Sequence, residues 1–143
     1  MRLQRTLLSV LALAATLVSC SSDDTDSGNG GPASVKKLET PKNRLSVSML
    51  LLDPAEFEGL RFEWQSAGDG LSYELAFDKN GGDFSAPVAS FTTSTNSHTL
   101  QLEEIQQLFD ENVDEAGESA VLDWRVYTTS DAGRFASAET RTL

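Results

Sequence analysis

The sequence predicts an all-β domain, an antiparallel β-sandwich crossed by one short helix. Three observations predict it. Apolar and polar residues alternate over several short segments, which is the period of a strand with one buried face. Clusters of Gly, Asp, Asn and Pro separate these segments, as turns do between antiparallel strands. Only one segment carries the apolar spacing of a helix.

Two alternating segments come first in this domain. Residues 45–50 alternate apolar with polar, and residues 60–65 do so again. The second segment places Leu60, Phe62 and Trp64 on one face. A Pro and a Gly between the segments favour a turn, so we expect two strands.

The middle of the chain predicts three more strands, at residues 71–78, 88–93 and 97–102. The loop that follows the first of them is rich in Gly, Asn and Asp. That first strand should direct four side chains inward: Leu71, Tyr73, Leu75 and Phe77.

One helix should interrupt the strands, because four apolar residues there share one helical face while Glu and Gln lie outside it. These residues are Leu102, Ile105, Leu108 and Phe109. We expect the helix to cross between two strands at one end of the sandwich.

The last strands are expected at residues 121–128 and 134–143. In the first, Leu122, Trp124 and Val126 should face inward, and Asp123, Arg125 and Tyr127 outward. About seven short strands separated by turns predict a β-sandwich of the immunoglobulin or fibronectin type.

The N-terminus resembles a bacterial lipoprotein signal. Two arginines precede an apolar run of about 12 residues, too short for a span, which needs about 20. The run closes with Leu17, Val18, Ser19 and Cys20. The resemblance implies cleavage before Cys20, the only cysteine, and acylation of that residue. A plain secretory signal or a short membrane anchor is the alternative.

An acidic cluster of Asp23, Asp24 and Asp26 follows directly. It resembles the export signal of surface-displayed lipoproteins in some Gram-negative glycan degraders, and a solvated acidic tether is the alternative. Residues 27–34 have the composition of a flexible linker. We therefore expect a signal at residues 1–19, an acylated tether at 20–35 and one folded domain at 36–143.

The net charge of the mature chain argues against two classes of partner. Loss of residues 1–19 removes two of the 11 basic side chains and none of the 22 acidic ones, leaving 9 against 22, a net charge of −13. This charge argues against nucleic acid, whose binding depends on neutralising phosphates, and against a polybasic contact with anionic lipid.

The order of the motifs resembles a known family. Phe62-x-Trp64, Tyr73-x-Leu75-x-Phe77-Asp78, a helix with Leu102 and Ile105, Leu122-x-Trp124-Arg125-Val126 and a closing strand with Ser137 follow one another. This pattern is similar to the N-terminal domain of the SusE/SusF family, outer-membrane lipoproteins of starch and other glycan utilisation systems.

The resemblance implies a non-catalytic lipoprotein anchored in the outer membrane and facing the exterior. Its implied partners are a starch-like or other polysaccharide and the lipoproteins of a glycan transporter. In longer family members, further modules hold the glycan while the N-terminal domain is spacer and scaffold. Because this chain stops at Leu143, no sugar-binding residue is carried over.

A carbohydrate site within this domain would need an exposed aromatic ring with polar groups beside it. Aromatic residues on inward faces are expected in the core, so outward or loop residues are the candidates. They are Tyr127 with Arg125 and Asp123 on the same face, and Phe84 and Phe57 in loops. An outward tyrosine can equally cover a neighbouring strand.

Metal binding and catalysis have little support. Residues 78–83 and 110–115 begin like calcium loops but lack the glycine and the closing glutamate that such loops need. His98 is the sole histidine, and no Gly-x-Ser-x-Gly motif is present. We expect no metal, no cofactor and no catalytic residue.

Two functions stay open. One is a scaffold, spacer or weak glycan-binding component of a glycan utilisation system. The other is a fibronectin-like structural or adhesive lipoprotein that contacts a protein partner through strand edges and outward faces. Calcium-dependent binding rests only on the incomplete loops.

Overall fold

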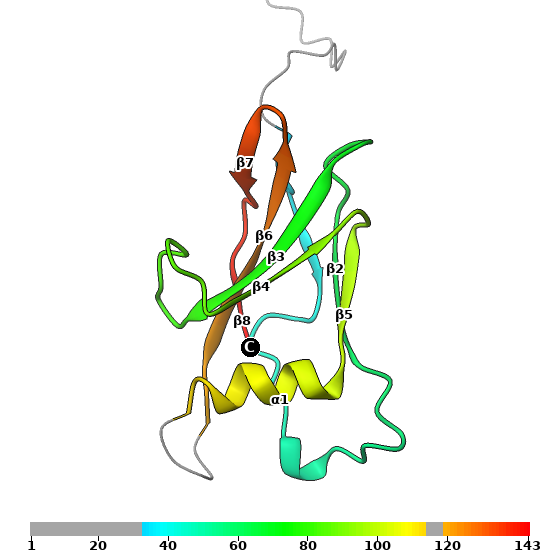
Figure 1. Ribbon diagram of the computed structural model, residues 1–143, viewed down its shortest axis with the longest axis vertical. Coiled ribbons are helices and arrows are strands. Elements are labelled where there is room, and N and C mark those ends of the chain that lie inside the picture. Colours follow the sequence, from blue (N-terminus) through cyan, green and yellow to red (C-terminus); the bar gives the residue numbers. More distant parts are fainter. Residues whose placement is uncertain (1–32, 114–118) are drawn as a thin grey trace, which may run out of the picture.

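The computed structural model describes residues 33–113 and 119–143, which form a sandwich of two antiparallel sheets (Figure 1). The smaller sheet has the order β1-β2-β5, with strands Leu38–Thr40, Leu60–Trp64 and Ser97–Leu100. The larger sheet has the order β4-β3-β6-β7, with strands Ala89–Thr93, Ser72–Lys79, Leu122–Ser130 and Gly133–Ala136. A last strand, β8 (Arg141–Thr142), also pairs with β6. The predicted all-β sandwich is confirmed.

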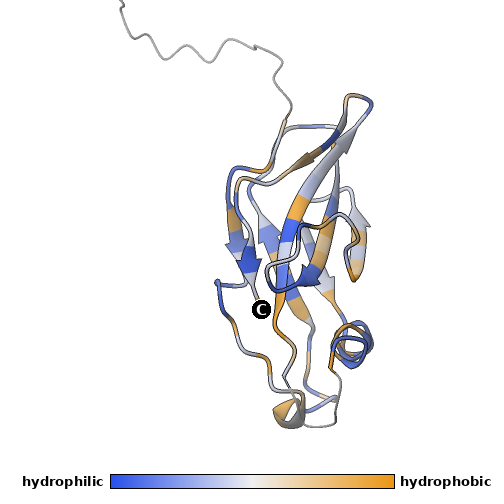
Figure 2. Ribbon diagram, turned by 90° about the vertical axis from the view of Figure 1, so that its left-hand side faces the viewer, coloured by the Kyte–Doolittle hydropathy of each residue, from blue (hydrophilic) through white to orange (hydrophobic). Residues whose placement is uncertain are grey.

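The β3–β6 pair is the centre of the larger sheet. Its register runs without interruption from Ser72 opposite Thr129 to Lys79 opposite Leu122. Figure 2 shows apolar and polar stretches alternating along the strands, as expected when one face of each sheet meets the core.

The core lies between the sheets and is rich in aromatic rings. Phe62 contacts Phe77 and Trp124 edge to face, with ring centroids 5.3 and 4.9 Å apart. Trp64 lies 5.6 Å from Tyr73. The predicted inward positions of these aromatic residues are confirmed, since all five are buried. Val35 is also fully buried, so packing of the sandwich begins before β1.

Helix α1 (Leu102–Asp110) is confirmed and leads from β5 in one sheet to β6 in the other. A capping box starts it, in which the Gln101 N–H donates to Glu104 Oε2 at 2.8 Å. Ile105 and Leu108 are buried against the core. The helix crosses the end of the sandwich opposite the β6–β7 hairpin (Figure 1). No helix in the described ranges is long and apolar enough to span a membrane.

The predicted strand at residues 45–50 is wrong. This segment contains no strand and passes into a short 3-10 helix, η1 (Met49–Leu51). The reason is that both edges of β2 are occupied, by β1 on one side and β5 on the other. The three-residue strand β1, which alternation did not reveal, pairs with β2 instead.

The predicted strand at residues 134–143 is two strands, β7 and β8. Both pair with β6 on the side away from β3. Between them the Ser137 hydroxyl accepts from the Val126 N–H at 3.3 Å and donates to the Glu139 carbonyl at 2.6 Å. The side chain thus takes part in the hydrogen bonding where the regular ladder stops.

Candidate functional site

The outward face of β6 brings together three of the five residues predicted for a carbohydrate site. Arg125 and Tyr127 alternate with the core residues of β6, as expected. Phe84 reaches the same face from the loop between β3 and β4, and it clusters with Tyr127 over Ala76 of β3. This loop residue is placed by Asp78, whose Oδ2 accepts from the Phe84 N–H at 2.8 Å.

Two arginines join these rings into a stack, which we call the arginine–aromatic ladder (Phe84, Arg125, Tyr127 and Arg134). The Arg125 guanidinium lies 4.5 Å from the centroid of Phe84 and 6.0 Å from that of Tyr127. Arg134 of β7 lies 3.4 Å from the centroid of Tyr127. The rings and guanidinium groups therefore alternate across the sheet.

Each arginine of the ladder also forms hydrogen bonds with a neighbouring side chain. Arg134 forms a two-pronged ion pair with Glu74 of β3, at 2.7 and 3.1 Å. Its hydrogen bonds with Glu74 raise the pKa of Arg134 further above its ordinary value. Arg125 donates through Nε and Nη2 to the Thr140 hydroxyl, at 3.1 and 2.6 Å. These contacts hold both guanidinium groups in place, so the polar groups of the ladder have a defined arrangement.

The expectation that the aromatic rings form an exposed platform is wrong. Tyr127 is 7% exposed and Phe84 is 3% exposed. Arg125 lies over the ring of Phe84 and Arg134 over that of Tyr127, so the arginines cover ring faces that a sugar would stack against. Phe57 is half-buried and packs against the main core.

Asp123 takes no part in the ladder. It is buried at the base of the loop after β3, where Oδ2 accepts from the Gly81 N–H at 2.8 Å. Oδ1 accepts from the Asn80 amide at 3.1 Å and from the Thr142 hydroxyl at 2.8 Å. Burial raises the pKa of Asp123, but these hydrogen bonds and the nearby charge of Arg125 outweigh it and hold the pKa below its ordinary value.

The carboxylates at the loop after β3 accept hydrogen bonds from the backbone of the loop itself. Asp78 accepts from the backbone of Lys79 and Phe84, and Asp83 accepts from the Ser85 N–H at 2.9 Å. Within residues 33–113 and 119–143, no three His, Cys, Asp or Glu side chains gather as metal ligands would. The second loop considered, residues 110–115, lies partly outside the described ranges.

His98 lies in β5, stacked on Phe91 with centroids 5.1 Å apart. Its Nε2 atom is buried and has no hydrogen-bond partner among the described residues. The Nε1 atoms of Trp64 and Trp124 share this property, which fits their place in the core.

A hollow of about 410 Å³ lies near the end of α1. Phe109 lines it together with apolar residues of the segment that follows β1 and with Val121. Its polar lining comes from Arg44, Asn80 and Thr142 among others. None of the residues predicted for a carbohydrate site lines this hollow.

Sequence reasoning missed Arg134, Glu74, Thr140 and Ala76 at this face. Their positions depend on the register of β3 and β7 against β6, which places Glu74 opposite Tyr127 and Arg134 opposite Thr129. The alternation of Tyr73 with Glu74 was a usable signal for Glu74. No comparable signal located Arg134, because β7 was not separated from β8.

The predicted N-terminal features lie outside the described residues. They are the cleavage residues Leu17, Val18 and Ser19, the acylated Cys20, and the acidic cluster Asp23, Asp24 and Asp26.

Comparison with known protein families gives a match. The model of a family described as "SusE outer membrane protein" matches residues 22–127, from just after Cys20 to Tyr127 in β6. No curated protein and no solved structure matches the chain.

Proposed function

Because this chain belongs to the SusE outer membrane protein family, we propose that it is a lipid-anchored scaffold of a glycan utilisation system. The family places the protein in the outer membrane. In the proposal, Cys20 carries the lipid, the residues between Cys20 and the start of the sandwich form the tether, and the sandwich holds a fixed position beside a transporter. The protein would have no catalytic role.

The burial of the aromatic residues carries the scaffold proposal. Trp64 and Trp124 are fully buried, and Tyr127 and Phe84 are nearly so. Carbohydrate sites usually stack the sugar ring on an exposed aromatic ring. With these rings covered, the faces of the sandwich are better suited to packing and positioning than to holding a glycan.

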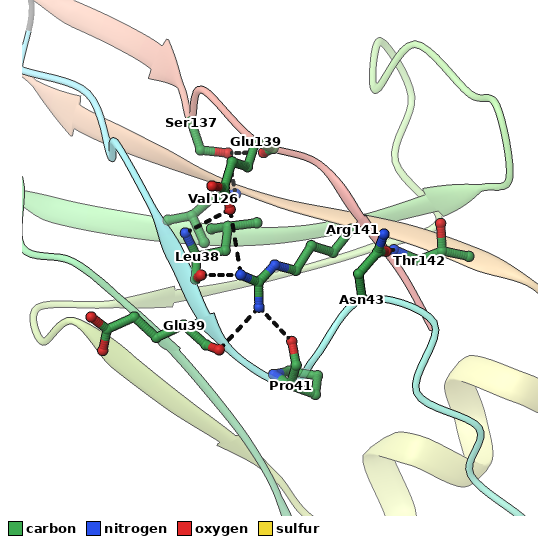
Figure 3. A network of polar contacts seen from close by, with 9 residues as sticks. All are labelled: Leu38, Glu39, Pro41, Asn43, Val126, Ser137, Glu139, Arg141 and Thr142. Atoms are coloured by element: carbon green, nitrogen blue, oxygen red, sulfur yellow. Dashed lines mark hydrogen bonds and ion pairs between the residues drawn. The ribbon is translucent and has the colours of Figure 1, made fainter.

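A network around Arg141 also supports this role (Figure 3). The Arg141 guanidinium donates to the carbonyls of Leu38, Glu39 and Pro41, and it pairs with Glu139. Glu139 in turn accepts from the Leu38 N–H at 3.1 Å. These contacts fasten β1, the first strand after the tether, to the segment that contains β8.

The start of the described chain is fastened in the same way. The Thr128 hydroxyl donates to the Ala33 carbonyl, and the Ala138 N–H donates to the Val35 carbonyl at 2.9 Å. Figure 1 places this start beside β7, at the end of the sandwich opposite α1. In the proposal, the tether therefore joins the sandwich at the end opposite α1 (Figure 1).

Weak glycan binding is the second candidate. It is favoured by the gathering of Phe84, Arg125 and Tyr127 on one outward face, as the sequence predicted for such a site. Binding there would require Arg134 to leave the Tyr127 ring.

Complementation separates the two candidates. A strain that lacks the chain should grow more slowly on the polysaccharide that its transporter imports. If the protein is a scaffold, a variant with Arg125→Ala and Arg134→Gln should restore growth as fully as the native chain. Restoration by the native chain alone, at equal amounts of protein in the membrane, would contradict the scaffold role and favour glycan binding.

A further inference from the structure

We propose that the groove between β4 and α1 binds an extended, positively charged segment of a partner protein, which adds to β4 as a further strand. This site is separate from the arginine–aromatic ladder, and the proposal goes beyond the scaffold function. It rests on the edge of β4, the shape of the groove and the charge of α1.

Strand β4 is an unprotected edge. It stands last in the larger sheet, and among the described residues only β3 pairs with it. Its sequence, Ala-Ser-Phe-Thr-Thr, contains no proline and no charge, which are the usual means of blocking an edge. Its outer N–H and C=O groups are therefore available to another strand.

The β1 edge of the smaller sheet differs. That strand has only three residues and runs directly into Pro41. Arg141 covers its carbonyl groups with hydrogen bonds. Among the described residues, the β1 edge is therefore covered and the β4 edge is not.

A groove of about 350 Å³ runs between β4 and α1. Val88, Phe91 and Leu108 give it an apolar floor, and all three pack on or within the main core. Glu104, Gln107 and Glu111 give it a polar wall. Such a groove can accept alternate side chains of an added strand.

The negative charge of α1 indicates that the partner segment is positively charged. The helix and its C-cap contain Glu103, Glu104, Asp110 and Glu111, with no basic residue in the last turn. None of the ion pairs among the described residues involves this helix. The acidic wall is therefore not neutralised by those residues.

The two acidic residues at the C-terminal end of α1 act against the helix itself. Acidic groups stabilise the first turn, but at the last turn they face the negative end of the helix dipole. Asp110 and Glu111 stand at this end. Of the two, only Glu111 lines the groove, and a local cost of this kind is expected where a binding surface needs the charge.

A basic, extended segment matches all three features. Its backbone would pair with β4, its apolar side chains would reach Phe91 and Leu108, and its Lys or Arg side chains would meet Glu104 and Glu111. The chain's own N-terminal segment does not fit, because Asp23, Asp24 and Asp26 would face the same acidic wall.

The test uses the protein purified from membranes in detergent and a fluorescent peptide with the sequence Thr-Lys-Val-Lys-Val-Lys-Val-Thr. We expect saturable binding by anisotropy below about 1 mM, weakened by salt, with slower amide hydrogen exchange in residues 89–93. A peptide with Glu in place of Lys, and one with the central Val replaced by Pro, should not bind.

Matched variants locate the site. Glu111→Gln removes a charge from the groove wall and should weaken peptide binding about fivefold to tenfold. Asp110→Asn removes a charge from the neighbouring residue, which does not line the groove, and should change binding less than about twofold. Both changes lie at an exposed helix end, and circular dichroism checks that each variant is folded.

Four outcomes would overturn the proposal. They are absence of binding up to about 1 mM, equal loss in both variants, equal binding of the proline peptide, and unchanged exchange in residues 89–93. None of them bears on the scaffold role, which the growth assay measures separately.

Discussion

Asp123 shows how a residue placed on the outward face by alternation can serve a different purpose. It stands directly opposite Asp78 across the β3–β6 pair, an arrangement in which like charges repel. Hydrogen-bond donors of the loop after β3, with the Thr142 hydroxyl, compensate this repulsion. The pair of carboxylates thus organises the loop that carries Phe84.

Stability should depend on the charge of Asp123. Because its pKa is lowered in the folded state, the stabilisation is fully present above the unfolded pKa of about 3.9 and is lost as the pH falls through the folded pKa. Asp123→Asn should lower the free energy of unfolding by about 1–3 kcal/mol near neutral pH. Urea unfolding of both proteins from about pH 7 to about pH 2 measures the difference.

The difference between the two proteins should shrink as the pH falls below about 4. An equal difference across the whole pH range would show that the charge of Asp123 does not stabilise the loop. Circular dichroism at each pH identifies the range in which both proteins remain folded.

At the residue scale, the sequence predicted which side chains face the core and which face outward. It did not predict which outward side chains are covered by other residues. Alternation correctly put Trp64 and Trp124 inside and Tyr127 on the outward face. It could not show that Arg134 lies on the Tyr127 ring, because that contact depends on the register of β7. Burial of an outward residue is decided by neighbours that are distant in sequence.

At the scale of elements, long alternating strands and the amphipathic helix were predictable, and short strands were not. The periodic pattern of apolar residues is long enough to be recognised in the sequence in three strands, β2, β3 and β6, and in helix α1. β1 and β8 have three and two residues, and pairing with a neighbouring strand defines them instead. Residues 45–50 alternate but form no strand, because both edges of β2 are already occupied, by β1 and by β5.

The attachment of β1 should contribute measurably to stability. Arg141→Ala removes the hydrogen bonds to three backbone carbonyls and should lower the free energy of unfolding by about 2 kcal/mol. Arg61→Ala is the control, because Arg61 pairs with Glu63 at 2.6 Å on an exposed surface. That variant should lose less than about 1 kcal/mol.

Chemical denaturation of the two variants measures this contrast. If Arg61→Ala and Arg141→Ala lowered stability equally, the network around Arg141 would not be what fastens the strand. Hydrogen exchange of residues 38–40 adds a local measure, since exchange there should quicken only in Arg141→Ala.

At the scale of the whole molecule, the order of motifs was the most informative property of the sequence. Each motif alone occurs in many sandwiches, but their order together predicted the SusE family, which the match over residues 22–127 confirms. The order of elements does not determine whether the outer faces bind a glycan. That depends on which side chains cover them, as Arg134 covers Tyr127.

Display on the cell surface is a further expectation for the whole molecule. Replacing Asp23, Asp24 and Asp26 by Ala should retain the protein in the outer membrane but turn it to the periplasmic side. External protease on intact cells should then no longer degrade it, whereas it should degrade the native protein. Equal degradation of both would show that the acidic cluster is a tether and not an export signal.

The measurement that most directly tests the scaffold role is affinity electrophoresis of the purified protein in gels that contain soluble polysaccharides. The native protein should migrate at the same rate in every gel as in a gel without polysaccharide. Retardation by one polysaccharide, lost in a folded variant with Arg125→Ala and Arg134→Gln, would contradict the scaffold role and make the arginine–aromatic ladder a glycan-binding site.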